Sequence, residues 1–187
     1  SKRQLLEKVK RFRKFEIFYG FTEREMMEIF GIAQEKSVPE GGLIFSEESR
    51  GTQFFIVETG KIKVYRDTPV GELVYREFGP GQFFGEVGLI DNLSRSANAL
   101  ATEPTTLISI NRNNLQLLLE SQKEMAVKMY WMFWKSLSTN LRNANTMMNK
   151  FFATFQEQSK AAKQQDPETE KPSKKQKQEK LSLEKKM

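Results

Sequence analysis

The chain has 187 residues, of which 38% are hydrophobic and 11% aromatic, which is enough for one ordinary core and too little for two full enzymatic domains. Its 30 Lys and Arg against 24 Asp and Glu give a net charge of +6, which permits an anionic partner without specifying one. The absence of Cys and His excludes disulfides, thiolate nucleophiles, histidine metal ligands and Ser-His-Asp catalysis, so we expect neither an enzyme nor a metal site.

The sequence carries no sign of a membrane segment or an export signal. No stretch approaches the ~20 apolar residues that span a bilayer, and the N-terminus lacks the apolar core of a signal peptide. We therefore expect a soluble, cytoplasmic protein with no membrane span. Ser1 is consistent with removal of an initiator Met, which favours a complete chain; a fragment of a longer protein is the alternative.

The N-terminal region is predicted to be helical. Residues 1–14 are expected to form a basic amphipathic helix, since apolar residues recur there at helical spacing among lysines and arginines. Thr22 and Glu25 have the spacing of a capping box, which predicts a second helix from Glu23 to about Gln34. The apolar residues on its expected buried face are Met26, Ile29, Phe30 and Ala33.

From Val38 to Ile110 the apolar residues fall into short runs separated by Gly, Pro, Asn and Asp, which is typical of strands and turns. No helix of about ten residues fits between the runs, so the pattern favours a small β-barrel or β-roll over alternating strands and helices. The runs are Leu43–Phe45, Phe54–Val57, Ile62–Tyr65, Leu73–Tyr75 and Leu107–Ile110. With its flanking helices, this β core is expected to occupy residues 15–122.

After the β region the sequence predicts two helices and a tail. Asn111 is the expected N-cap of a short helix, and a longer helix follows over residues 123–156. The apolar residues of the long helix alternate spacings of three and four, the heptad pattern that buries a seam between helices. This heptad stripe consists of Val127, Tyr130, Trp134, Leu137, Leu141, Ala144, Met148, Phe151 and Phe155. Residues 157–187 are rich in Lys, Gln and Glu and contain no aromatic residue, so we expect a charged, disordered tail.

Two interpretations of the heptad stripe are compatible with the sequence. In one, its first two turns, with Trp131 and Phe133, pack on the β core of the same chain. Beyond Leu137 a partner helix is required, and a second copy of the same helix is the simplest partner, so we favour a parallel homodimer through the stripe. The basic residues lie at both ends of the chain rather than on one element, so we expect no specific nucleic-acid binding.

Residues 81–99 contain the strongest candidate site. Gly85 and Gly88 flank Glu86, so the backbone can approach a ligand closely while Gly85 offers its N–H to an anion. Arg95 follows nine positions after Glu86. A guanidinium offers paired donors to a phosphate, and a carboxylate accepts from sugar hydroxyls, so the combination favours a nucleotide. The alternative is a surface ion pair, which is worth at most about 1 kcal/mol.

Residues 84–97, which we call the cassette, resemble the phosphate-binding cassette of the cyclic nucleotide-binding domain family. The matching residues are Phe84-Gly85-Glu86-Val87-Gly88-Leu89 and Arg95-Ser96-Ala97, and the likeness extends over about residues 15–150. It implies an α+β fold: an antiparallel, jelly-roll-like β-roll (a double-stranded β-helix) flanked by N-terminal helices and a long C-terminal helix. It also implies a regulator that binds cyclic AMP or cyclic GMP without catalysis.

The resemblance implies a role for each matching residue. Arg95 would pair with the cyclic phosphate, and Glu86 would accept from the ribose 2′-hydroxyl. The N–H groups that would complete the anion site are those of Gly85, Val87 and Ser96, with Gly88 packed closely behind them. In length and pattern the region from Arg95 through the long helix is similar to the catabolite activator protein, and on that alignment Asn140 falls where the helix contacts adenine. Relatives that favour cyclic GMP carry Thr at position 96, so the Ser favours cyclic AMP.

Two departures from the family pattern stand near the site. Glu48 replaces a Gly of the strand signature, which predicts a different turn that does not touch the ligand, and Ser94 replaces a Pro.

We expect the long helix to cover the base and to pass the signal to an unidentified protein effector. We expect no DNA-binding helix-turn-helix after that helix. The alternatives are a scaffold that keeps the fold and the dimer without a ligand, a cyclic GMP sensor and, last, a nonspecific nucleic-acid binder.

Overall fold

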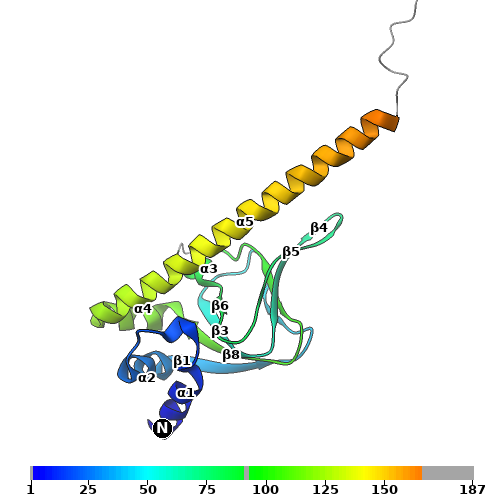
Figure 1. Cartoon of the computed structure of the whole chain (residues 1–187). Helices are drawn as coiled ribbons and strands as arrows, with labels where there is room; N and C mark the ends of the chain where they lie inside the picture. Colours follow the sequence, from blue (N-terminus) through cyan, green and yellow to red (C-terminus); the bar gives the residue numbers. More distant parts are fainter. Residues whose placement is uncertain (1, 91–92, 166–187) are drawn as a thin grey trace, which may run out of the picture. The chain divides into compact units, whose positions relative to one another are not determined.

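The computed structural model describes residues 2–90 and 93–165 (Figure 1). The chain divides into two units, Ser1–Asn140 and Leu141–Met187. Every strand that the structure describes belongs to the first unit, and the described part of the second unit is helical. Within residues 2–90 and 93–165, none of the helices combines the length and the apolar character that crossing a bilayer requires.

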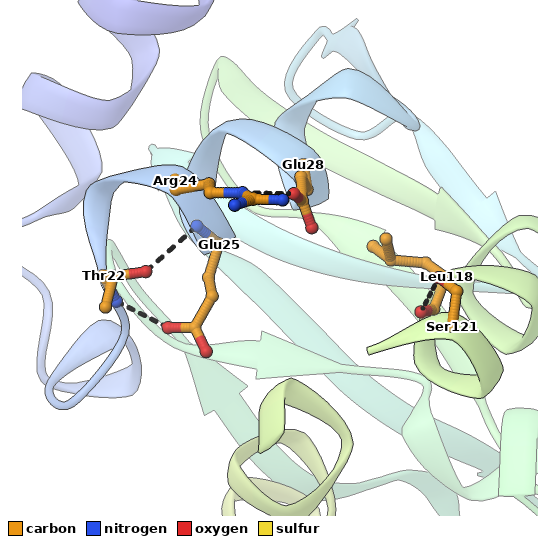
Figure 2. Close-up of polar contacts among 6 residues, drawn as sticks. All are labelled: Thr22, Arg24, Glu25, Glu28, Leu118 and Ser121. Carbon is orange, nitrogen blue, oxygen red and sulfur yellow. Dashed lines mark hydrogen bonds and ion pairs between the residues drawn. The ribbon is translucent and has the colours of Figure 1, made fainter. Parts of the chain in front are cut away.

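Three helical segments precede the sheets. They are α1 (Lys2–Phe12), the single 3-10 turn η1 (Glu16–Phe18) and α2 (Glu23–Gly31). The predicted capping box of α2 is confirmed: the Glu25 N–H donates to the Thr22 hydroxyl at 3.2 Å, and the Thr22 N–H donates to the Glu25 carboxylate at 2.6 Å (Figure 2). Each bond satisfies a donor that the first turn of a helix otherwise leaves open, so the box fixes where α2 begins.

The predicted end of α2 is wrong. Ala33, which we expected on the buried face of the helix, instead opens strand β1 (Ala33–Val38). This strand pairs with β8 (Thr105–Asn111) over its whole length, from Ala33 opposite Ile110 to Val38 opposite Thr105. The paired residues lie 67 to 77 positions apart along the chain, so the local helical spacing of residues 29–33 contained no sign of the pairing.

In the described residues, eight strands form two antiparallel four-stranded sheets, with orders β1-β8-β3-β6 and β2-β7-β4-β5. The remaining strands are β2 (Leu43–Phe45), β3 (Gln53–Thr59), β4 (Ile62–Thr68), β5 (Gly71–Phe78), β6 (Phe83–Phe84) and β7 (Asn98–Ala101). The predicted α+β fold with an antiparallel β-roll is therefore confirmed. Strands β1, β6 and β7 were not predicted, because the first is mostly polar, the second has two residues and the third is four residues long with a single large apolar side chain, Leu100.

The residues of β3 face two hydrophobic clusters in alternation. Phe54 and Ile56 pack against the helices, whereas Phe55 and Val57 pack between the two sheets. All four are buried, which explains why β3 is apolar throughout rather than in every second position. Figure 1 shows α1 and α2 together beside β1, where their buried side chains cover this sheet on the side away from the second sheet.

Two helices follow the sheets. In α4 (Arg112–Ser121) the predicted cap is confirmed, since the Asn111 side chain accepts from the Asn113 N–H at 2.9 Å. The long helix α5 (Lys123–Gln165) begins where predicted but continues beyond the expected end at Gln156. Residues 157–165 are mostly Ala, Lys, Gln and Glu, which are good helix formers, and this composition extends the helix into the expected tail. The rest of that tail, residues 166–187, lies outside the described residues.

In the first unit, α5 packs on the roll through a different face from the heptad stripe. Its buried residues there are Met125, Ala126, Met129 and Phe133. The ring of Phe133 lies edge-on against Phe54, with 5.5 Å between the ring centroids. Val127, Tyr130 and Trp134 of the stripe are instead 69%, 61% and 69% exposed. The interpretation that the first turns of the stripe pack on the same chain is therefore wrong, although Phe133 beside the stripe does.

Candidate functional site

The cassette connects the two sheets. Its first residue, Phe84, pairs in β6 with Phe55 of the first sheet, and α3 (Glu86–Ile90) follows directly. After residues 91–92, which lie outside the described residues, the chain enters β7 of the second sheet. There Ala99 pairs with Val64 of β4. Both ends of the cassette are thus fixed by antiparallel pairing, which positions the turn and helix between them.

Two glycines let the cassette backbone approach its neighbours closely. Gly85 has a φ of +82°, and a Cβ at this position would lie only 2.8 Å from Nη1 of Arg95. Gly88 in α3 packs against Gly51, where a Cβ would lie 3.0 Å from the Gly88 Cα. Neither approach tolerates a side chain without a shift of the backbone or of the guanidinium. Gly51 was not identified from the sequence.

Arg95 is a buried cation held by main-chain carbonyls. Its side chain is 5% exposed, Nη1 donates to the Gly85 carbonyl at 2.8 Å, and Nη2 donates to the Gln53 carbonyl. The guanidinium also lies over the Phe45 ring, with its carbon 4.1 Å from the centroid. Its Nε is buried and makes no hydrogen bond. Burial lowers the pKa of Arg95 to about 10, so the group stays charged at neutral pH while its Nε has no acceptor.

Glu86, the first residue of α3, is a buried acid held by side chains of α5. It is 2% exposed, and its Oε1 accepts from Ser136 Oγ at 2.9 Å and from Asn140 Nδ2 at 3.2 Å. The Asn140 Oδ1 in turn accepts from Nη1 of Arg76 in β5 at 2.8 Å. Burial raises the pKa of Glu86, and the bond from its own N–H, the bond from Ser136 and the charges of Arg76 and Arg95 oppose that rise. The site therefore contains two buried ions of opposite charge on one short segment.

Comparison with known proteins assigns this segment to a family. The model described as "Cyclic nucleotide-binding domain" matches residues 35–122, which include the whole cassette. This segment belongs to the cyclic nucleotide-binding domain family. The cyclic AMP receptor protein of Thermus thermophilus is 32% identical over 104 residues, covering 55% of this chain and 48% of the relative. The cAMP-dependent protein kinase regulatory subunit of Yarrowia lipolytica is 29% identical, covering 65% of this chain and 31% of the relative.

Solved structures agree with that assignment. The catabolite activator protein of Thermus thermophilus superposes with a TM-score of 0.62 at 28% identity, covering 72% of this chain and 62% of that one. A cyclic nucleotide-binding domain from Methylobacillus flagellatus gives a TM-score of 0.69 at 23% identity, covering 80% and 85%, which shows the shared fold. The chain spans less than half of the length of the two curated relatives described above.

The structure brings most of the predicted site residues together. Gly85, Glu86 and Arg95 share direct contacts or electrostatic interactions, and Gly88 is packed behind them. Val87 and Ser96, which follow the two ions in sequence, are exposed. The resemblance placed Asn140 on adenine, but the hydrogen bonds of its side chain join Glu86 to Arg76.

Several residues that support the site were not identified from the sequence. Ser136 lies one helical turn before Asn140, so the i, i+4 spacing of two polar residues on α5 was an available signal. Phe45 was identified only as part of a strand. Arg112 donates to the Gly88 carbonyl and thereby ties α3 to the start of α4, and no sequence pattern indicated this contact.

The turn at Glu48 contacts the cassette. Glu48 adopts the left-handed conformation that favours Gly, with a φ of 63°. Its N–H donates to the Arg95 carbonyl at 2.8 Å, and the Arg95 N–H donates to the Ser49 carbonyl at 2.8 Å. A Glu at this position thus forms a turn that a Gly would form with less strain, and the turn holds the backbone of Arg95.

These features fit the ligand class that the family implies. A buried guanidinium whose Nε lacks an acceptor is suited to an anionic oxygen, and the Gly85 main chain leaves room for the close approach that this requires. Glu86 supplies a carboxylate for a hydroxyl donor on the same segment. Phosphate and sugar hydroxyl are the two groups that a cyclic nucleotide presents side by side.

Proposed function

We propose that this chain is a cytoplasmic regulatory module that binds cyclic AMP. It signals through α5 and does not catalyse a reaction. The observation that carries the proposal is the buried, hydrogen-bond-deficient Arg95 within a cassette that also buries Glu86. The printed names of two relatives, a cyclic AMP receptor protein and a cAMP-dependent protein kinase regulatory subunit, support the choice of ligand. In this proposal α5 passes the signal to a protein effector.

In this proposal each part of the ligand has its own partner. The cyclic phosphate pairs with Arg95, whose Nε gains the acceptor that it lacks, and the ribose 2′-hydroxyl donates to Glu86. The remaining phosphate contacts come from backbone donors, the N–H groups of Gly85, Val87 and Ser96. The start of α5 covers the base. Ser96 favours cyclic AMP, and cyclic GMP is the second choice.

Isothermal titration calorimetry with cyclic AMP and cyclic GMP tests this function. The protein is first freed of nucleotide by unfolding and refolding. We expect a dissociation constant on the order of micromolar or tighter for cyclic AMP, and a loss of about tenfold or more in Arg95→Ala. Arg24→Ala is the matched control, because Arg24 pairs with Glu28 at 3.1 Å on the surface of α2 (Figure 2). Absence of heat with both nucleotides would leave the scaffold as the better interpretation.

We also propose that the chain forms a parallel homodimer through the heptad stripe. Three stripe residues of the first unit are more than 60% exposed, and in the second unit Leu141 and Phe151 are 63% and 66% exposed. Apolar side chains at heptad spacing on a helix surface are best covered by a second copy of the same stripe. Sedimentation analysis should give twice the chain mass for the wild type and for Asn143→Glu, which lies off the stripe, and the chain mass for Leu141→Glu. A monomeric wild type at tens of micromolar would contradict the dimer.

A further inference from the structure

The carboxylate of Glu86 is held by α5, and both of its side-chain partners come from one stretch of that helix. Ser136 and Asn140 are four residues apart, so they lie one above the other on the same helix face. Both donate to the same carboxylate oxygen, Oε1, at 2.9 and 3.2 Å. An sp² oxygen has two lone pairs, so Ser136 and Asn140 occupy Oε1. The carboxylate also accepts from its own N–H, so one lone pair of Oε2 remains for a further donor.

The amide of Asn140 has a fixed orientation. Its Nδ2 donates to Glu86, and its Oδ1 accepts from Arg76 at 2.8 Å. A reversed amide would set oxygen against carboxylate and nitrogen against guanidinium, so only the observed orientation satisfies both neighbours. Arg76 is itself placed by Phe78, since its guanidinium carbon lies 4.7 Å from the ring centroid. Asn140 thus links a cation of β5 to the acid of α3.

We infer that Ser136 and Asn140 are positioning residues for the sugar, because they hold the Glu86 carboxylate so that Oε2 accepts a hydrogen bond from the ribose 2′-hydroxyl. Through the same two residues, α5 responds when the ribose binds to Oε2. Asn140 acts through Glu86 and not on the base. This inference rests on the proposed function, in which Glu86 is the partner of the ribose. It deepens that function by naming the contact through which the helix detects the ligand.

Among the residues that the structure describes, no hydrogen bond joins Arg95, the proposed phosphate partner, to α5. Arg95 donates to the carbonyls of Gly85 and Gln53, which belong to the roll. The effect of Ser136 and Asn140 on affinity is therefore confined to ligands that carry the 2′-hydroxyl. Because coupling between two sites is reciprocal, a helix contact that strengthens ribose binding is itself strengthened when ribose binds.

A cycle of variants and ligands tests the inference. Calorimetry compares cyclic AMP with 2′-deoxy cyclic AMP in the wild type, Ser136→Ala, Asn140→Ala and Thr139→Ala. We expect the first two variants to bind cyclic AMP about tenfold more weakly and to bind the 2′-deoxy analogue as the wild type does. Thr139→Ala is the matched control, because the Thr139 hydroxyl bonds to the Lys135 carbonyl of its own helix.

Two results would overturn the inference. Equal losses for the two ligands in Asn140→Ala, or a changed preference between cyclic AMP and cyclic GMP, would place Asn140 on the base. Unchanged affinity for both ligands in Ser136→Ala and Asn140→Ala would remove the positioning role altogether. A wild type that binds neither ligand would instead refute the proposed function, so the two failures are distinguishable.

The two tryptophans of the chain, Trp131 and Trp134, provide an independent measure of the helix. Both lie on α5 near Ser136 and are 63% and 69% exposed in the single chain. Trp134 belongs to the stripe that we propose as the dimer seam, so the emission reports on this part of the helix in the dimer. At saturating cyclic AMP we expect a change in emission in the wild type and in Thr139→Ala, and less than half of that change in Asn140→Ala. The full change in Asn140→Ala would show that α5 does not detect the ligand through Glu86.

Discussion

Arg95 and Glu86 are buried ions of opposite charge on one segment, but different parts of the protein hold them. The guanidinium of Arg95 donates to two main-chain carbonyls of the roll and lies on an aromatic ring. The carboxylate of Glu86 accepts from two side chains of α5. Main-chain partners are fixed by the sheet, whereas side-chain partners on another element follow that element when it moves.

This difference separates affinity from signalling. In our account the phosphate half supplies binding energy that does not depend on α5, because Arg95 needs only the roll. The sugar half, which is Glu86 with its two partners, signals ligand binding to α5, because the Glu86 carboxylate contacts both the ligand and the helix. A ligand shifts a conformational equilibrium only through contacts that differ between two states, and Glu86 is where such contacts meet.

Gly85→Ala should disrupt both the phosphate contact of Arg95 and the sugar contact of Glu86. The φ of +82° is unfavourable for Ala, and the added Cβ would lie 2.8 Å from Nη1 of Arg95. We expect a loss of about 1–3 kcal/mol in the free energy of unfolding, together with loss of nucleotide binding. Thermal denaturation and calorimetry measure the two effects. Gly79→Ala is the control, because no atom lies within 4 Å of a Cβ built there; equal damage in both variants would remove the special role of Gly85.

Arg95→Lys should affect the phosphate half alone. Lysine keeps the charge but loses the planar set of donors, so we expect about tenfold or more weaker binding, which corresponds to about 1.5–3 kcal/mol for a charge-assisted pair. Cyclic AMP and 2′-deoxy cyclic AMP should weaken by the same factor, and the tryptophan emission at saturation should not change. A loss of affinity for cyclic AMP alone would mean that Arg95 also affects the ribose contact, so the phosphate and sugar sites would not be independent.

Glu86→Gln should weaken binding and stabilise the ligand-free protein. Burial raises the pKa of Glu86 in the fold, so the fold gains stability as this group is protonated and loses it as pH rises through the folded pKa. The amide has no such charge, and we expect it to add about 0.5–2 kcal/mol at neutral pH. Melting temperatures from pH 5 to 8 measure this: the advantage of the variant should grow with pH. An advantage that is constant or grows toward pH 5 would contradict the assignment.

Glu48→Gly should have the smallest effect. The substitution relieves a left-handed conformation at a φ of 63°, and the greater freedom of Gly in the unfolded chain offsets part of the gain. We expect the free energy of unfolding to rise by up to about 1 kcal/mol, measured by urea denaturation. Glu40→Gly makes the same change at an exposed position that lacks a positive φ, and it should not stabilise. Destabilisation by Glu48→Gly would mean that the Glu side chain itself supports the turn.

The sequence predicted the site better where its residues are neighbours in the chain. Glu86 and Arg95 stand nine positions apart in one motif, and the structure buries both. The partners of Glu86 lie fifty or more residues away, so only the fold brings Ser136 to the carboxylate. Strand β1 was missed for the same reason, because its polar residues are strand-like only through pairing with β8.

The net positive charge was the least informative part of the sequence. In α1, Arg11 pairs with Glu58 at 3.0 Å and Lys8 pairs with Glu35 at 3.4 Å, and both acids belong to strands of the roll. Lys8 and Arg11 thus contribute to the attachment of this helix to the sheet. Composition gives the number of charged residues but no information about their ion-pair partners. For this reason the net charge was compatible with an anionic binding partner but gave no evidence for one.

A crystal structure of the full chain with cyclic AMP would test the central claim most directly. We predict a phosphate oxygen within hydrogen-bond distance of Arg95 Nε and the ribose 2′-hydroxyl on Oε2 of Glu86, with Ser136 and Asn140 still donating to Oε1. A nucleotide bound elsewhere on the chain, or one bound in the cassette with Glu86 turned away from α5, would contradict the account.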